Sequence, residues 1–567
     1  MKNQSVIIVG LRMLQTFRRV TWIPALFLFA NMQSARAGSA TWNTTPDSVD
    51  WNTSANWTPA TVPNGPADMA TFGVSNTTSI SLSGSIQVDR IVFNPNSSAF
   101  TFSCPLGFFS FAGSGVMNNS QAAQNFVATS SMAFAAGQFD FDNGATAGNA
   151  TFTHRCDAGP CGQSIFSGTS TAGDATFVNQ PGASGGGLMT FGTSSTAGNS
   201  TLITNGGSDS APGAGRVQFL GTSSAGNSTI ITNGATSSAG LGGSVEFDTN
   251  STASNAIITA NGGTGLSAPG GATIFASSSS ADNATLIANG GTNGGQSGII
   301  SFLEGATGGT SLVEVFGTGT GAGADGTLDI SEHFEGVTIG SLEGNGLVFL
   351  GANNLTIGSN NLNTSFGGII QGTGSMTKTG TGKLNFSGAN TYRGGTTITA
   401  GTLLVTNRRG SGAGGGQVQV KGGKLGGTGK MSGNVFVGDG SGPVAFIAPG
   451  VTNAVPAILT IQKKLTFRAD GTDQFGYKTT DPSADKVVAH GVTIESGALL
   501  SFGPIDTGAL PIGTVFTAID NTATTAIAGT FANIADGATV TVGGNTFQAD
   551  YEGGDGNDLT LTVVQWP

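Results

Sequence analysis

A phenylalanine recurs at nearly constant spacing through the middle of the chain, and this period constrains the fold more than any other feature. The series is Phe141, Phe166, Phe191, Phe219, Phe247, Phe275 and Phe302, at steps of 25, 25, 28, 28, 28 and 27 residues. A second series follows eight residues after the first six members: Asn149, Asp174, Asn199, Asn227, Asn255 and Asn283. Because that interval is constant, all change in length falls in the glycine-rich end of each repeat. A fixed corner with a tolerant loop is typical of a coil built from stacked repeats.

The repeats contain short alternating runs, such as 200–203 and 284–287, and no amphipathic helical pattern. A period in the twenties without helices predicts an all-β fold, a parallel β-helix (β-solenoid) with about 25–28 residues per rung. Successive rungs would stack about 4.8 Å apart. We therefore expect the phenylalanines to form an aromatic stack inside and the Asn/Asp series to form a hydrogen-bonded ladder at a turn.

The amino-acid composition and net charge argue against several other fold classes and partners. Glycine makes up 94 of the 567 residues, and charged residues are only 9% of the chain. Collagen needs a strict Gly-X-Y period, which is absent, and disordered tracts lack regularly placed Ile, Leu, Val and Phe. Leucine-rich repeats share the period but need a Leu-x-x-Leu-x-Leu pattern that is missing here. The net charge of −11 makes nucleic acid and anionic membranes poor partners.

Residues 1–37 have the layout of a secretory signal peptide. Basic residues precede an apolar run at 20–30, and Ala35-Arg36-Ala37 then offers small residues for cleavage before Gly38. The apolar run is much shorter than the roughly 20 residues that a membrane span needs. We therefore expect an exported chain with no transmembrane segment after cleavage.

Three tryptophans, Trp42, Trp51 and Trp57, lie close together at the start of the expected mature chain. One hypothesis is a sugar-binding platform, since aromatic faces stack on sugar rings. The favoured interpretation is a cap, because the terminal repeat of a stacked structure must cover an otherwise open core.

An acidic cluster, Asp325, Asp329, Glu332, His333 and Glu335, is the densest group of charges in the chain. Polysaccharide-cleaving β-helix enzymes use paired carboxylates, so Asp329, Glu332 and Glu335 are the candidates for such a role. The spacing fits a solvated turn better, and no Lys or Arg lies between Arg216 and Lys378. We therefore predict no catalytic residues.

Two further groups are candidates for metal sites. His154 lies near Cys156 and Cys161, but a fourth ligand is missing, and the two cysteines could instead oxidise after export, leaving Cys104 unpaired. The tail at 553–558 contains Asp555 and Asp558 in a single copy of a calcium-binding nonapeptide pattern, whereas calcium β-rolls need tandem copies. A glycine-rich hairpin into a last strand at 559–564 is the favoured interpretation. No metal or cofactor is predicted.

Residues 376–405 carry the most distinctive motif, three short predicted strands at 383–387, 396–399 and 402–405 separated by glycine turns. Met-Thr-Lys-Thr-Gly-Thr-Gly-Lys-Leu at 376–384 and Ser-Gly-Ala-Asn-Thr-Tyr-Arg-Gly-Gly-Thr at 387–396 resemble the autotransporter-associated β-strand repeat, with a likeness over roughly 325–405. That repeat occurs in exported passenger domains of Gram-negative bacteria. The resemblance implies a right-handed parallel β-helix and a surface-facing protein, and it defines no catalytic residues.

The predicted organisation after the signal peptide has four segments. They are a tryptophan-containing β cap with the first strands at 38–125, regular solenoid repeats at 126–320, the autotransporter-associated repeat at 321–410, and a continuing and capping β region at 411–567. An autotransporter ends in a membrane barrel of tilted strands about 9–11 residues long. Residues 406–567 are too few and too polar for one, so no barrel is expected.

These patterns predict a non-enzymatic, exported β-helical protein with a structural or adhesive role. It would be secreted or held at the surface of a Gram-negative bacterium, with the periplasm as an alternative. Its expected partners are components of cell surfaces or extracellular matrix. Two alternatives remain open: a polysaccharide-binding or polysaccharide-cleaving β-helix, and a passenger whose translocator is encoded separately.

Overall fold

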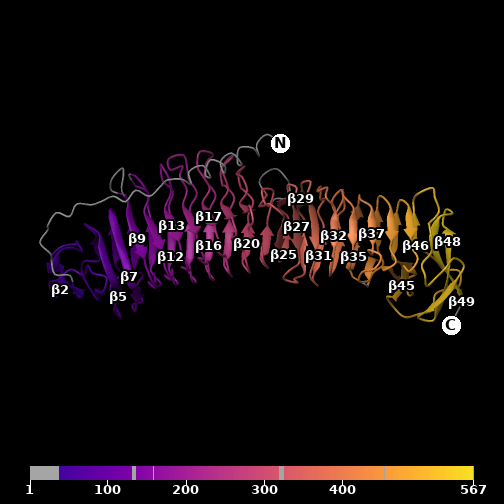
Figure 1. Cartoon of the computed structure of the whole chain (residues 1–567), viewed down its shortest axis with the longest axis horizontal. Coiled ribbons are helices and arrows are strands. Elements are labelled where there is room, and N and C mark those ends of the chain that lie inside the picture. The colour runs from indigo at the N-terminus through magenta and orange to yellow at the C-terminus, as the bar shows by residue number, and fades with distance from the viewer. Residues whose placement is uncertain (1–37, 131–135, 158, 318–324, 453, 566–567) are drawn as a thin grey trace. The chain divides into compact units, whose positions relative to one another are not determined.

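The computed structural model describes residues 38–565, apart from 131–135, 158, 318–324 and 453. Regular structure within these residues is β-strand, with one short 3-10 turn at Ser54–Asn56. No helix in the described part of the chain is long and apolar enough to cross a membrane. Parallel strands stack into a β-solenoid of about 17 turns, which confirms the predicted fold (Figure 1). The expected signal peptide at 1–37 lies outside the described residues.

Each turn of the regular part contributes one strand to each of two parallel columns (Figure 1). The first column contains β9 (Gly137–Phe141), β11 (Gln163–Phe166), β13 (Leu188–Phe191), β15 (Arg216–Phe219), β17 (Ser244–Phe247), β19 (Ala272–Phe275) and β21 (Ile299–Phe302). The second contains β10 (Thr151–His154), β12 (Thr176–Asn179), β14 (Thr201–Thr204), β16 (Thr229–Thr232), β18 (Ile257–Ala260), β20 (Thr285–Ala288) and β22 (Leu312–Val315). Each strand pairs in register with the strand one turn later, as Phe191 does with Phe219.

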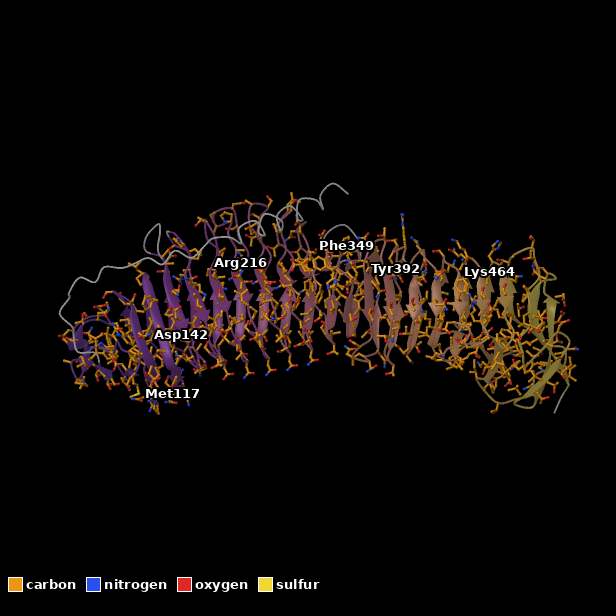
Figure 2. The ribbon with its side chains drawn as sticks, viewed as in Figure 1. Met117, Asp142, Arg216, Phe349, Tyr392 and Lys464 are labelled. Carbon is orange, nitrogen blue, oxygen red and sulfur yellow. A yellow bond between two sulfur atoms is a disulfide. The ribbon has the colours of Figure 1, made fainter. Side chains whose placement is uncertain are left out.

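The phenylalanine series occupies the last position of every first-column strand. Side chains alternate between partly exposed and buried along these strands because successive residues point to opposite faces. Figure 2 labels one residue of the partly exposed set, Arg216. The seven rings lie in the core with neighbouring centroids 4.5–5.0 Å apart and planes within 3–13° of parallel. The predicted aromatic stack is therefore confirmed, at the spacing of the strands themselves.

A second stack, not predicted from the sequence, runs through the other column. Phe102, Phe126, Phe152 and Phe177 lie 4.7 Å apart between successive ring centroids. From β14 onward the same register position is filled by Leu202, Ile230, Ile258 and Leu286. The two stacks face each other across the interior, as the T-shaped contact of Phe166 with Phe177 shows. Together they fill the core of each turn.

The predicted polar ladder is present on the surface. Asn227 Nδ2 donates to Asn199 Oδ1 at 3.2 Å, and Asn255 Nδ2 donates to Asn227 Oδ1 at 3.2 Å. A second, half-buried ladder follows the second-column strands directly, in which Asn233, Asn261 and Asn289 each donate to the asparagine of the preceding turn at 2.9 Å. Each side-chain amide both donates and accepts a hydrogen bond, so asparagines at the same position of successive turns satisfy one another's hydrogen-bonding groups.

The turns become shorter and gain a third column from β24 (Val337–Ile339) onward. This column continues through β27 (Asn354–Ile357), β30 (Ser375–Lys378), β32 (Thr396–Ile398), β34 (Val418–Val420) and β37 (Val435–Val437). The second column continues through β28 (Thr364–Phe366), β31 (Lys383–Phe386), β33 (Thr402–Val405), β35 (Gly423–Gly427) and β38 (Ala445–Pro449). The first column ends at β29 (Ile369–Gln371). Loops take its place in the next two turns, and strands fill this position again from β36 (Lys430–Met431) onward.

Antiparallel strands close both ends of the described chain. At the start, β1 (Ala40–Trp42) pairs antiparallel with β2 (Trp57–Thr58) and parallel with β3 (Met69–Phe72). At the end, β46 (Val515–Asn521), β48 (Asn545–Gly553) and β49 (Asp558–Gln565) form antiparallel pairs. Such pairing covers strand edges that would otherwise be open to other chains.

Candidate functional site

The three tryptophans considered as a sugar platform are buried. Trp42, Trp51 and Trp57 are 2%, 0% and 1% exposed. Trp57 packs edge-to-face against both others, at centroid distances of 5.1 Å to Trp42 and 4.8 Å to Trp51. The indole N–H of Trp51 donates to Pro63 O at 3.0 Å, and that of Trp57 donates to Trp51 O at 2.8 Å. No indole face is free to stack on a sugar, and the cluster fills the first turns of the solenoid.

The acidic cluster forms a turn held by its histidine. His333 accepts at Nδ1 from the Gly336 N–H at 3.1 Å and donates from Nε2 to Ala306 O at 2.8 Å. Asp329 Oδ1 accepts from the Ser331 N–H at 2.9 Å, and burial raises the pKa of this carboxyl group. Asp325 is buried, whereas Glu332 and Glu335 are exposed. These contacts give the cluster a role in shaping the turn.

His154, Cys156 and Cys161 do not form a set of metal ligands. Cys156 and Cys161 are joined by a disulfide. His154 is fully buried, and its ring nitrogens bind Asn179 Oδ1 at 2.5 Å and Ser164 Oγ at 2.8 Å. Burial lowers the pKa of His154 to about 4, while the Asn179 contact opposes that shift. Cys104 is a buried free thiol whose pKa burial raises to about 11.

The acidic tail is the turn of a hairpin between β48 and β49. Asp558 Oδ1 accepts from the Asn521 N–H at 2.8 Å, so this carboxylate is part of the fold, whereas Asp555 is exposed. Nearby, Asp536, Asp550 and Glu552 place carboxylate oxygens within 4.8 Å of one another. All three are exposed, and Asp536 and Asp550 already accept backbone N–H groups at 3.1 and 2.9 Å. Two of the three carboxylates therefore accept backbone hydrogen bonds, and all three face solvent.

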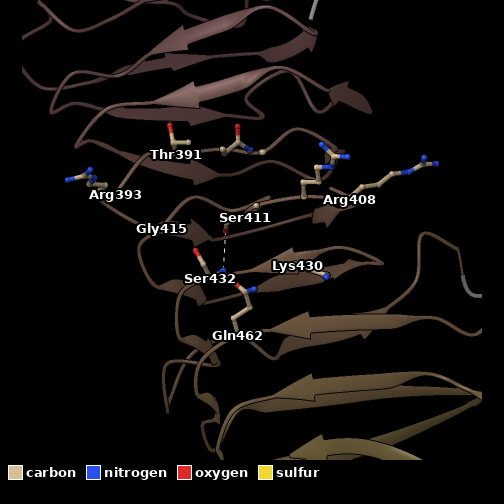
Figure 3. Close-up of a pocket in the computed structure, with 12 residues that line it drawn as sticks. Thr391, Arg393, Arg408, Ser411, Gly415, Lys430, Ser432 and Gln462 are labelled. Atoms are coloured by element: carbon tan, nitrogen blue, oxygen red, sulfur yellow. Dashed lines mark hydrogen bonds between the residues drawn. The ribbon is translucent and has the colours of Figure 1, made fainter. Parts of the chain in front are cut away.

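The feature that sequence reasoning missed is a groove of about 600 Å³ at the corner where the first column has ended. We call it the basic groove, and its charged side chains are Arg393, Arg408, Arg409 and Lys430. All four are exposed. Figure 3 shows Arg393 and Arg408 on opposite sides of the groove, with Ser411 and Ser432 between them and Lys430 on the same side as Arg408. The groove therefore carries cations from several successive turns.

The loop 387–395, between β31 and β32, forms one wall because it covers the edge left by β29. Asn390 Oδ1 accepts from the Ile370 N–H at 2.8 Å, and the Thr391 N–H donates to Ile370 O at 2.9 Å. The next residue, Tyr392, turns inward and is fully buried. Its hydroxyl group contacts Thr396 Oγ1 at 2.6 Å. With Tyr392 anchored inside, Arg393 is carried to the surface.

The second wall, the loop 406–417, is held by a buried asparagine. Asn407 is 3% exposed and donates to the carbonyl groups of Arg409 and Gly410, each at 3.1 Å. Its Oδ1 accepts from the Lys430 N–H at 2.9 Å. Asn407 thus ties the turn bearing the two arginines to the strand bearing Lys430. Ser411 Oγ, below them, accepts from the Ser432 N–H at 3.2 Å (Figure 3).

These supports hold the basic side chains of the groove on a frame of hydrogen-bonded loops. Guanidinium groups donate paired hydrogen bonds to planar or tetrahedral oxyanions, and an ammonium group adds a point charge. The nearest sequence signal was the Arg408-Arg409 pair, but its relation to Arg393 and Lys430 depends on the length of the turns. The described lining of the groove contains arginine, lysine, serine, threonine and amide side chains and no carboxylate.

Comparison with known proteins identifies the segment beside this groove. Residues 376–405 match the sequence model of the passenger-associated-transport-repeat family. A stretch of 104 residues, 18% of this chain, is 36% identical to the adhesin BmaC autotransporter of Brucella suis biovar 1 (strain 1330). The chain spans only about 3% of that relative's length. The chain thus carries a repeat of the autotransporter passenger type, which confirms the resemblance read from its motifs.

Proposed function

We propose that this chain is an exported, adhesin-like β-solenoid that acts at the surface of a Gram-negative bacterium without catalysing a reaction. The observation that carries the proposal is the passenger-associated-transport-repeat at 376–405, which is built into the solenoid through β30–β33. The strands of this repeat pair with turns on both sides, so the repeat is an integral part of the fold. The name of the similar adhesin supports the same class of function.

The disulfide supports passage through an oxidising compartment. Cys156 and Cys161 are bonded, and such bonds persist in the periplasm and outside the cell but are rare in the cytosol. The bond closes a short loop between β10 and β11, two strands of the regular columns. A chain folded in the cytosol would keep these thiols reduced.

The stacked turns of the solenoid suit a protein that presents surface loops at fixed spacing. The strands of the columns pair with the turns before and after them, so each turn supports its neighbours. The corner loops can vary in sequence and length and contact molecules outside the protein, while the stacked core keeps the distance between loops constant. Adhesion through loops needs only this display. No catalytic step is required of any residue.

Adhesion is tested by coating beads with the purified mature protein and measuring their attachment to host cells and to extracellular-matrix components. We expect attachment above that of beads coated with an unrelated β-solenoid of similar charge. Equal attachment of both bead types would contradict the adhesive role. Release of reducing or unsaturated ends from a polysaccharide panel, abolished by Asp329→Asn, would replace the proposal with an enzymatic one.

A further inference from the structure

Charge is segregated along this acidic chain in a way that singles out the basic groove. Residues 344–438 contain eight Lys or Arg and no Asp or Glu, although the whole chain has 21 basic and 32 acidic residues. That segment spans the turns from β27 to β37, which include the walls of the groove. With no carboxylate in the segment, its cations lack local partners in sequence. The groove is therefore an electropositive band within an electronegative solenoid.

The four cations of the groove are available to an external ligand. Among the described residues, no ion pair involves Arg393, Arg408, Arg409 or Lys430. Thr391 and Gln462 are exposed beside them and offer hydroxyl and amide groups that bind neutral polar atoms. Lys463 and Lys464 follow Gln462 on the surface, so the positive charge continues one turn further. The ligand that fits carries several anions and many hydroxyl groups.

The groove crosses successive turns, which indicates an elongated ligand. Its lining comes from the loops 387–395 and 406–417, from β36 (Lys430–Met431), and from Gln462 after β39 (Ile458–Ile461). Backbone hydrogen bonds join these segments from one turn to the next. Gly412 N–H donates to Lys430 O at 2.9 Å, and Gln462 N–H donates to Met431 O at 2.9 Å. A linear polymer lying along the solenoid would meet one or two cations at each turn.

We propose that the basic groove binds an acidic polysaccharide, through the carboxylate or sulfate groups that such chains carry at regular intervals. Arg393, Arg408 and Arg409 bind the oxyanions, Lys430 adds charge, and Thr391 and Gln462 bind hydroxyl groups of the sugar ring. Single-stranded nucleic acid fits less well because it is held by stacking on aromatic rings, and the one aromatic residue of the loop, Tyr392, is buried. The proposed binding site does not depend on display of the protein at the cell surface.

Binding of the purified full chain to immobilised polymers tests the proposal. The probes are polygalacturonate for carboxylate and dextran sulfate for sulfate, with neutral dextran as the uncharged sugar, polyglutamate as a non-sugar polyanion and duplex DNA as a phosphate polymer. We expect binding to at least one acidic polysaccharide and none to dextran. We also expect weakening of binding as salt rises, because counterions compete for the same charges.

The double variant Arg408→Gln/Arg409→Gln should weaken that binding by about tenfold or more, since two charge-assisted contacts are lost. Lys383→Gln/Lys421→Gln is the matched control, because it removes the same charge from exposed residues of the same segment that do not line the groove. Far-UV circular dichroism shows whether both variants keep the fold. Equal weakening in both variants would overturn the site. Binding to DNA or polyglutamate tighter than to either acidic polysaccharide would overturn the ligand class, and no binding to any polyanion would overturn both.

Discussion

At the scale of single residues, the corners of the solenoid depend on backbone conformations that few side chains tolerate. Gly148, Gly173, Gly198 and Gly226 occupy the same corner of successive turns with φ between 61° and 64°. In the next turns Ser254 and Asp282 take that position, with φ of 50° and 46°. Left-handed geometry costs an ordinary L-residue roughly 1–2 kcal/mol. The corner therefore explains why glycine recurs one residue before each asparagine of the surface ladder up to Asn227.

Replacing Gly198 by alanine should lower the free energy of unfolding by about 1–2 kcal/mol or more. An added Cβ would lie 2.8 Å from Gly173 O, a backbone atom of the preceding turn that cannot move independently. Gly192→Ala is the control in the same turn, since its Cβ would meet nothing closer than Phe166 O at 3.7 Å. Denaturant midpoints of the two variants measure the difference. Equal midpoints would show that the corner is not constrained.

His154 predicts a specific loss of stability in mild acid. Its pKa is about 4 in the folded protein, against about 6.5 when unfolded, because burial disfavours the charged ring. The unfolded chain therefore takes up a proton first as pH falls through 6.5, and the folded state loses stability until about pH 4. The expected contribution of His154 at pH 5 is a loss of about 2 kcal/mol relative to pH 8.

Urea unfolding at pH 8 and pH 5 measures this effect, by comparing the wild type with His154→Gln. The pH-dependent loss should be smaller in the variant by about the stated amount. His490→Gln is the control, because it makes the same replacement at an exposed histidine. An unchanged pH dependence in His154→Gln would contradict the assignment of a neutral, buried ring.

At the scale of elements, two asparagine ladders make the same contact in different surroundings. Asn255 is exposed, with side-chain hydrogen bonds of 3.2 and 3.3 Å to the turns before and after it. Asn261 lies six residues later, is half-buried, and makes both bonds at 2.9 Å. Water replaces a lost partner readily at the first position and poorly at the second. The inner ladder should therefore contribute more to stability.

Asn261→Ala should destabilise the protein by about 1–2 kcal/mol, because two partly buried amides lose a partner. Asn255→Ala should cost less than about 0.5 kcal/mol, as is usual for exposed positions. Equilibrium unfolding in guanidinium chloride compares the two variants, which differ in burial but not in chemistry. A larger effect at Asn255 would contradict the importance of the inner ladder.

The phenylalanine stack and the outer ladder were predictable from sequence because each keeps one residue type at a constant interval. The second-column stack was not, since its phenylalanines give way to leucine and isoleucine after Phe177 and no single letter repeats. The basic groove was hidden for another reason. Arg393, Arg408 and Lys430 are brought to one corner only by the shorter turns near β31–β35, and a net charge of −11 conceals a local excess of cations.

At the scale of the whole molecule, different parts of the described solenoid have different structural roles. The tryptophans near the start of the described chain fill the first turns, the regular part supplies length, and the passenger-type repeat contributes one wall of the basic groove. The solenoid fold was predictable from the sequence, whereas the basic groove was not. A repetitive fold is recognisable from the regular spacing of its residues. A binding site depends on side chains that depart from the repeat, so regular spacing does not reveal it.

The thiols report whether the molecule folded in an oxidising compartment. Alkylation of the unfolded, unreduced protein should modify one cysteine, Cys104, and alkylation after reduction should modify three. Native protein should resist alkylation, because Cys104 is buried with a pKa of about 11 and only the thiolate reacts. Three reactive thiols in protein trapped directly from cells would contradict an oxidised, exported form.

Surface display is tested most directly by labelling intact cells that produce the full chain. An impermeant amine reagent should modify exposed lysines such as Lys430 and Lys464 without disrupting the outer membrane, while a periplasmic marker remains unlabelled. We expect labelling of this protein in intact cells at the level reached after permeabilisation. Labelling that appears only after the outer membrane is opened would contradict it.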